Sequence, residues 1–155
     1  KQDGVEVWVM GMRPTWWKFR WMHTPWTNDL FTYHALVSTF DIGLAPVKGD
    51  PWSLCRSDLK ALDYSVQGVA PLLSDNAPYK HWAHGESCLK AKNPKEWLDN
   101  LKTLVRDETA RKEIARRANE YVLKERTAEK NVWRWAEALD DVSRKAALRA
   151  AAPTL

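Results

Sequence analysis

Arginine, serine and aspartate occur together in the segment CRSDLKALD, residues 55–63. Arg56 and Ser57 stand where a helix over residues 56–67 is expected to begin, and free backbone N–H groups and the positive end of the helix dipole favour an anion there. The arginine adds a bidentate, charge-assisted contact to phosphate. Asp63, about two turns into the helix, could accept hydrogen bonds from two neighbouring hydroxyls of a ribose. This set of residues predicts a site for a nucleoside diphosphate.

The same segment also has an ordinary structural interpretation. Serine and aspartate are common at the first turn of a helix because they cap it. Lys60 is a candidate contact to a base or sugar, but it can also pair with Asp63 across the helix surface, which is worth only about 0.2–0.5 kcal/mol. Three loop residues have two interpretations each. Trp26 and Trp52 could stack on a base or a sugar or simply pack, and Asp50 could contact hydroxyls or cap its loop.

The pattern of apolar residues predicts the elements that position this segment. Short apolar runs bounded by glycine or proline predict buried strands at residues 5–10, 41–46 and 69–74 and a short strand at 87–92. The tryptophan-rich segment 13–26 is predicted as a loop that includes a short strand at 19–23. Capping residues predict helices over 28–39, over 56–67 with Gly68 as a left-handed cap, over 94–106 with Asn93 as N-cap, from Asp107 onward, and over 127–149 with Thr127 as N-cap.

Buried strands that alternate with helices predict an α/β fold with a parallel sheet covered by helices on both faces. Right-handed connections place the loops after the strands at one edge of that sheet, where ligands bind. We therefore expect the site to be lined by the loops that follow Met10, Ala45 and Ser74. The expected domains are a Rossmann-like domain over 1–126, a helix over 127–150 that packs on it, and a frayed tail at 151–155.

Residues 40–79, FDIGLAPVKGDPWSLCRSDLKALDYSVQGVAPLLSDNAPY, resemble the donor-binding segment of retaining glycosyltransferases of the GT-B fold, the large group-one family. That family often shows a pattern like fDiglaPl…dtPfn..kS.lK.lEya..GvPvvaSdvgpY. A weaker similarity continues through HGESCLKAKNPKEWLDNLKTLVRDETARKEIARRA, residues 84–118. The residues in register are Pro51-Trp52, Arg56-Ser57, Leu59-Lys60, Leu62-Asp63-Tyr64, Gly68, Ser74-Asp75 and Pro78-Tyr79.

The resemblance implies roles for individual residues. Asp63 takes the place of the second glutamate in the family's Glu, seven residues, Glu motif, whose carboxylate holds the ribose hydroxyls of the donor. The first glutamate of that motif falls at Cys55, and a thiol cannot replace a carboxylate that accepts hydrogen bonds from sugar hydroxyls. The residues that lie where the family contacts the diphosphate are Arg56, Ser57, Asp58 and Leu59.

By the same resemblance, the chain covers most of the second of two Rossmann-like domains and lacks that domain's first strand-helix unit. The complete enzyme would transfer a hexose from a nucleotide sugar, such as a UDP- or GDP-sugar, by front-side, retaining transfer. The acceptor domain would belong to the same longer chain or to a partner chain. The resemblance implies no cofactor and no metal, since no acid pair of the Asp-x-Asp type is present, and it assigns no catalytic residue.

Two other functions stay open. A non-catalytic binding or assembly module on the same scaffold is consistent with Cys55. A nucleic-acid binder is consistent with the net charge of +4 and with the tryptophan cluster of residues 16–26. The charges of residues 106–130 alternate in sign at helical spacing, however, which is typical of a solvated helix face. We therefore expect a phosphorylated small molecule rather than nucleic acid as the partner.

The composition is that of a globular protein in a reducing compartment. With 155 residues, of which 45% are hydrophobic and 28% charged, the chain can form a domain with its own core. The two cysteines show no spacing typical of a disulfide framework or a zinc site, which favours the cytoplasm. No run approaches the roughly 18 apolar residues of a membrane span, so none is expected.

Overall fold

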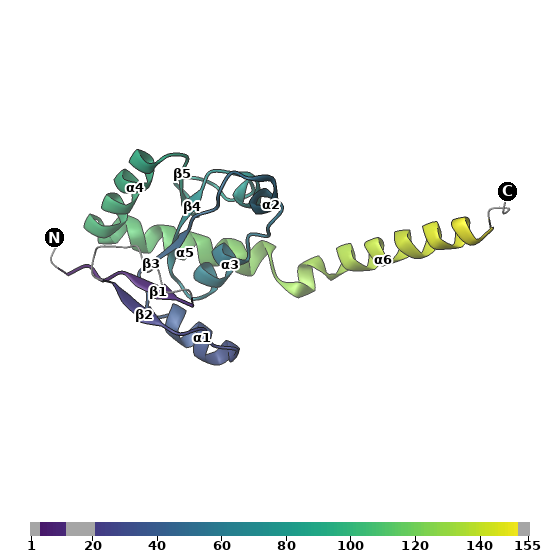
Figure 1. Cartoon of the computed structure of the whole chain (residues 1–155), viewed down its shortest axis with the longest axis horizontal. Coiled ribbons are helices and arrows are strands. Elements are labelled where there is room, and N and C mark those ends of the chain that lie inside the picture. Colours follow the sequence, from purple (N-terminus) through teal and green to yellow (C-terminus); the bar gives the residue numbers. More distant parts are fainter. Residues whose placement is uncertain (1–3, 12–20, 152–155) are drawn as a thin grey trace. The chain divides into compact units, whose positions relative to one another are not determined.

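The computed structural model describes residues 4–11 and 21–151 and shows an α/β protein whose strands run parallel in two small sheets. The chain forms two compact units, Lys1–Asn119 and Glu120–Leu155. The sequence predicts one sheet, whereas the described strands form a two-stranded sheet and a three-stranded sheet, both in the first unit. Figure 1 shows the order of the elements along the chain.

The smaller sheet pairs β1 (Trp8–Met10) with β2 (Met22–Thr24), in parallel. The strand predicted at residues 5–10 is therefore shorter than expected, and the prediction that it is buried is wrong. Trp8 and Met22 each keep 39% of their surface exposed. In a two-stranded sheet each strand has a hydrogen-bonded neighbour on one side only, so β1 and β2 are both edge strands. The strand predicted at 19–23 corresponds to β2, but its first two residues lie outside the described residues.

The larger sheet holds β3 (Ile42–Ala45), β4 (Ala70–Ser74) and β5 (Leu89–Ala91) in that order, all parallel. This confirms the strands predicted at 41–46, 69–74 and 87–92. β4 lies in the middle and is buried along its whole length, whereas β3 is an edge strand whose Leu44 is 40% exposed.

Helices cover both faces of this larger sheet (Figure 1). On one face, Gly43 of β3 lies directly against the ring of Tyr64 on α3 (Leu59–Val66). On the other face, α4 (Pro94–Arg106) and the first part of α5 (Glu108–Glu125) close a core. The members of that core are Ala70, Leu72, Leu89, Leu104, Ile114 and Ala115.

Most helix ends follow the capping residues that the sequence shows. Asp29 caps α1 (Leu30–Val37) by accepting from the amide of Thr32 at 2.9 Å, and Asn93 caps α4 by accepting from that of Glu96 at 3.0 Å. Gly68 follows α3 with a φ of +72°, the left-handed conformation expected of it. These predictions are confirmed, although α1 ends two residues before the predicted residue 39.

The helix predicted over 56–67 begins three residues late, at Leu59. A separate short helix, α2 (Pro51–Leu54), occupies the preceding segment, where the sequence predicts a loop. Asp50 caps α2 and Pro51 is its first residue, a start signal as clear as the one at Asn93. Residues 55–58 therefore connect two helices rather than forming the first turn of α3.

In the second unit, α6 (Ala128–Ala151) begins after Thr127, whose Oγ1 accepts from the amide of Lys130 at 3.4 Å. This confirms the predicted start of the last helix, while its packing on the domain stays a prediction. Of the tail expected at 151–155, Ala151 still belongs to α6 and the remaining residues lie outside the described part. No helix of the described residues is long and apolar enough to cross a membrane.

Candidate functional site

The carboxyl ends of β3, β4 and β5 lie at one edge of the larger sheet, because the three strands are parallel. Two of the loops expected to line the site, those after Ala45 and Ser74, leave from this edge. The third, after Met10, leaves the smaller sheet. The loop after Ala45 passes through α2 and then reaches the start of α3, so the segment singled out in the sequence belongs to this edge.

At the start of α3, the backbone offers donors that the helix does not use. The first amides that bond within this helix are those of Ala61 and Leu62, which both donate to the carbonyl of Asp58, at 2.9 and 3.2 Å. The amides of Leu59 and Lys60 precede them and have no carbonyl one turn back inside the helix. Both side chains are exposed, and so are those of Arg56 and Ser57 just before them.

Asp58, expected at the diphosphate, turns its side chain inward. Its Oδ2 accepts a hydrogen bond from Nε1 of Trp82 at 3.0 Å, and the residue is only 9% exposed. Trp82 is itself 1% exposed, so this is a buried contact between the loop after β4 and the start of α3. The carboxylate therefore faces the interior of the protein.

Tyr79 lies beside this cluster, at the end of the 3-10 turn Ala77–Tyr79. Burial raises the pKa of its phenol, the negative charge of Asp58 raises it further, and the positive charge of Arg56 lowers it. Both charges therefore act on the same buried ring. The loop after β4 thus meets the start of α3, as the expected site requires.

Asp63, expected to hold a ribose, lies half-buried on α3 at its contact with α1. Its Oδ2 accepts a hydrogen bond from the hydroxyl of Tyr33 at 3.0 Å. Burial, followed by this hydrogen bond and the charge of Asp63, raises the pKa of Tyr33. Asp63 therefore has a hydrogen-bond donor within the protein, Tyr33, which the sequence does not predict. Tyr33 lies thirty residues away, and the period of α1 indicates only that it faces inward.

Asp50, a possible contact to a base or sugar, caps α2. Its Oδ1 accepts from the amide of Ser53 and its Oδ2 from the Ser53 hydroxyl, both at 2.9 Å. These two hydrogen bonds, the backbone one first, lower the pKa of the Asp50 carboxyl. Of the two interpretations that the sequence allows for Asp50, the structure therefore shows the capping one.

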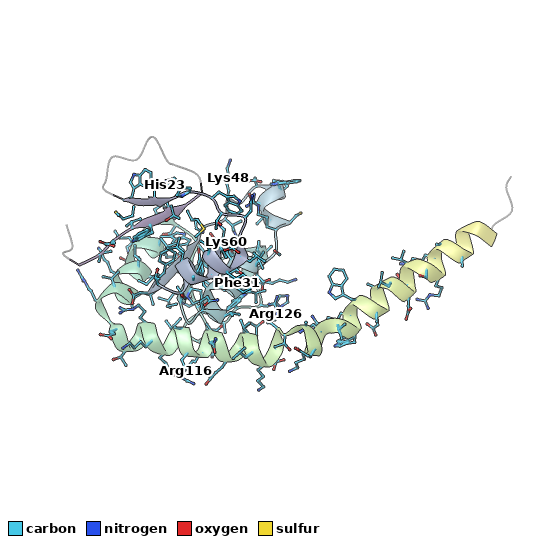
Figure 2. The ribbon with its side chains drawn as sticks, turned by 90° about the horizontal axis from the view of Figure 1, so that it is seen from below. His23, Phe31, Lys48, Lys60, Arg116 and Arg126 are labelled. Carbon is cyan, nitrogen blue, oxygen red and sulfur yellow. The ribbon has the colours of Figure 1, made fainter. Side chains whose placement is uncertain are left out.

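The remaining candidate residues are exposed. Trp52 on α2 is 78% exposed and Trp26, in the loop after β2, is 70% exposed. The Trp26 indole donates to Oδ1 of Asn28 at 3.0 Å. Cys55 is an exposed free thiol at the end of α2, and Lys60 is exposed on α3. Figure 2 shows Lys60 and Lys48 on the part of the molecule that is built around the sheet.

A cavity of about 500 Å³ lies at the ends of all three strands of the larger sheet. Lys48 and Lys92 supply its positive charges, and Oδ1 of Asn76 is buried there without a hydrogen-bond partner among the described residues. None of the candidate residues lines this cavity. The sequence predicts that the loops after β3 and β4 line a site, and residues of both loops line this cavity. It does not single out Lys92, which follows β5, although the rule that ligands bind at the carboxyl ends of strands applies to that loop equally. The full lining is Pro46, Val47, Lys48, Gly49, Ser74, Asp75, Asn76, Ala91, Lys92 and Trp97.

A second cavity, of about 310 Å³, adjoins the first through Asp75 and Lys92. The Lys92 ammonium lies 3.4 Å from a carboxylate oxygen of Asp75, and that of Lys90 lies 4.0 Å from the other oxygen. His84 lines the same cavity and accepts, through Nδ1, from the amide of Lys90 at 2.9 Å. His84 is thus part of the turn that leads into β5.

Within residues 4–11 and 21–151, no three side chains of His, Cys, Asp or Glu are grouped closely enough to hold a metal ion.

Comparison with models of protein families, with curated proteins and with solved structures gives no match to this chain.

Proposed function

We propose that this chain is the nucleotide-sugar donor-binding domain of a retaining glycosyltransferase. The observation that supports this most is the exposed start of α3, with Arg56 and Ser57 in front of free backbone amides at the carboxyl edge of a parallel sheet. In this proposal the two small sheets are parts of one Rossmann-like domain of a GT-B enzyme. The complete enzyme transfers a hexose to an acceptor held by another domain, in the same longer chain or in a partner chain.

The start of α3 is suited to a diphosphate by both charge and hydrogen bonding. The amides of Leu59 and Lys60 and the positive end of the helix dipole favour an anion. The Arg56 guanidinium adds a charge that can bind two phosphate oxygens at once. Asp58 would repel a diphosphate if its carboxylate faced outward, but the hydrogen bond from Trp82 holds that carboxylate inside the protein.

Asp63 provides the proposed contact to the ribose. Its Oδ2 is hydrogen-bonded to Tyr33, and Oδ1 has no hydrogen-bond partner among the described residues. An ionised carboxylate oxygen can accept more than one hydrogen bond, so Oδ1 is available to ribose hydroxyls. The Tyr33 hydroxyl fixes the orientation of the carboxylate, which lowers the entropy that binding would otherwise cost.

Cys55 favours a second candidate function, a non-catalytic binding or assembly module on the same scaffold. The thiol is exposed at the end of α2, one residue before Arg56. It stands where the resemblance places a carboxylate for the donor sugar. A module of this kind would bind the nucleotide diphosphate but would gain little affinity from the attached sugar, so comparing UDP with UDP-glucose separates the two functions.

The test is a calorimetric titration of the whole chain with UDP and GDP. Arg56→Ala removes a charge-assisted contact that is typically worth about 1.5–3 kcal/mol, so we expect the dissociation constant to rise about tenfold or more. Lys112→Ala is the matched control, because it removes an exposed charge from α5, where Lys112 pairs with Glu108 at 2.6 Å. We expect the control to bind as the unaltered chain does. Equal affinities of the two variants, or no binding by the unaltered chain, would contradict a donor site at α3.

A further inference from the structure

α6 carries a continuous stripe of exposed apolar side chains. Val132, Trp135, Leu139 and Val142 follow one another at intervals of three and four residues and are 61%, 73%, 64% and 63% exposed. This spacing is the seven-residue repeat with which helices pack side by side. The same repeat continues to Ala128 on one side and Ala146 on the other. Trp133 lies off the stripe, and its indole donates to the carbonyl of Lys130 on its own helix at 2.9 Å.

The order of residue sizes along this stripe is nearly symmetrical about its centre, where Trp135 and Leu139 differ. A small residue stands at each end, a valine comes next on each side, and the two largest residues lie at the centre. We propose that α6 pairs with α6 of a second copy of the chain, antiparallel, along this stripe. In the pairing Ala128 meets Ala146, Val132 meets Val142 and Trp135 meets Leu139, and each pair occurs twice because of the two-fold symmetry.

The residues that flank the stripe fit this antiparallel arrangement. Ala136 lies on one flank and faces Ala136 of the second copy, and Ala138 faces Ala138 in the same way on the other flank. Such small residues let the two helices approach closely beside the central pairs of Trp135 with Leu139. Towards the ends, Glu129 lies opposite Ser143 and Asn131 opposite Lys145. No two like charges meet along either flank, and the opposed helix dipoles also favour antiparallel pairing.

A parallel pairing of the same stripe matches sizes less well. It would put Trp135 against Trp135 in one central layer and Leu139 against Leu139 in the other. The antiparallel arrangement instead combines a large and a medium side chain in each of the two central layers, which fills space more evenly. With 24 residues, α6 also exceeds the length of about 12–15 residues below which isolated helices are marginal in water.

Sedimentation equilibrium of the whole chain over a range of concentrations tests the pairing. We expect the mean mass to rise from that of one chain towards that of two. Leu139→Asp puts charges into both central layers and should raise the dissociation constant of the dimer at least about tenfold. Glu137→Ala, on the opposite face of α6, is the matched control and should leave it unchanged, and circular dichroism checks that both variants keep their helix content. A chain that stays monomeric overturns the proposal, since another segment or another protein would then cover the stripe. Equal dissociation constants of the Leu139→Asp and Glu137→Ala dimers also overturn it.

Cysteine cross-linking tests the direction of the pairing, in a Cys55→Ser background that removes the exposed native thiol. Antiparallel helices bring residue 132 of one copy next to residue 142 of the other. We therefore expect a disulfide-linked dimer when Val132→Cys and Val142→Cys chains are mixed, and little from either variant alone. A parallel pairing would link each variant to itself and would overturn the antiparallel arrangement.

Discussion

The orientation of the Asp58 side chain affects the charge at the start of α3. An exposed carboxylate beside Arg56 would neutralise the arginine and repel phosphate. The hydrogen bond from Trp82 instead draws the acid into the interior, where it is 9% exposed. The contact joins residues that are 24 positions apart, so the sequence around Asp58 indicates only a polar residue at a helix start.

The buried thiol of Cys88 leads to a prediction about pH. Burial raises its pKa to about 12 from an ordinary value of 9.0, against a smaller decrease from the charge of Lys90 and with a still smaller increase from the charge of Asp75. Because the folded-state pKa lies above the unfolded one, the unfolded chain releases this proton first as the pH rises. The contribution of Cys88 to stability is therefore complete below about pH 9 and is lost as the pH approaches 12.

Urea denaturation between about pH 8 and pH 11 measures this effect. We expect the free energy of unfolding to fall less steeply with pH in Cys88→Ala than in the unaltered chain. Cys55→Ala is the control, since that thiol is exposed, and should keep the original slope. If Cys88→Ala and the unaltered chain lose stability in parallel, the thiol is not buried as described.

Among the helices and strands, β3 and α3 are in close contact where Gly43 meets the ring of Tyr64. A Cβ atom added to Gly43 would lie 2.3 Å from the Tyr64 ring, which is much too close for either side to remain in place. The Tyr64 hydroxyl also donates to the carbonyl of Leu44 at 3.0 Å, so the ring is fixed at both ends. This contact sets the position of α3, and with it the start of the candidate site.

We expect Gly43→Ala to lower the free energy of unfolding by about 1–3 kcal/mol, as overpacking a core usually does. Gly49→Ala is the matched control, because a Cβ there meets nothing within 4 Å, and should change stability by no more than about 0.5 kcal/mol. Chemical denaturation of both variants decides the matter. Equal stabilities would show that Tyr64 does not rest on Gly43.

The elements that could be predicted from the sequence are those with local signals. Asn93-Pro94 and Asp29 mark helix starts, Gly68 marks a helix end, and the continuous apolar run of β4 marks a central strand. The exposure of β1 could not be predicted, because an apolar run indicates a strand but not how many neighbours cover it. α2 was missed although Asp50-Pro51 is a clear start signal, since the helix that follows is only four residues long.

At the scale of the whole molecule, the site could be predicted in outline only. The sequence predicts a site among the loops that follow β3 and β4, and the structure confirms that both loops leave a common edge, because the strands are parallel. It did not show that Tyr33 binds Asp63 or that Trp82 binds Asp58, since both contacts join distant parts of the chain. Nor did it predict the cavity between Lys48 and Lys92, which forms only when three separate loops come together.

The same edge of the sheet therefore offers two places for an anion. One is the start of α3, with Arg56 and the amides of Leu59 and Lys60. The other is the cavity of about 500 Å³ at the ends of the three strands, whose positive charges are Lys48 and Lys92. The proposed function requires the first.

An amide NMR titration of the whole chain with UDP distinguishes these two places most directly. We expect saturable shifts that are largest at the amides of Leu59 and Lys60, with a second set near Asp63, the proposed contact to the ribose. The same titration with Arg56→Ala should need about tenfold more nucleotide or more to reach the same shifts. Shifts centred on Lys48, Asn76 and Lys92, or no saturable shifts at all, would contradict a donor site at the start of α3.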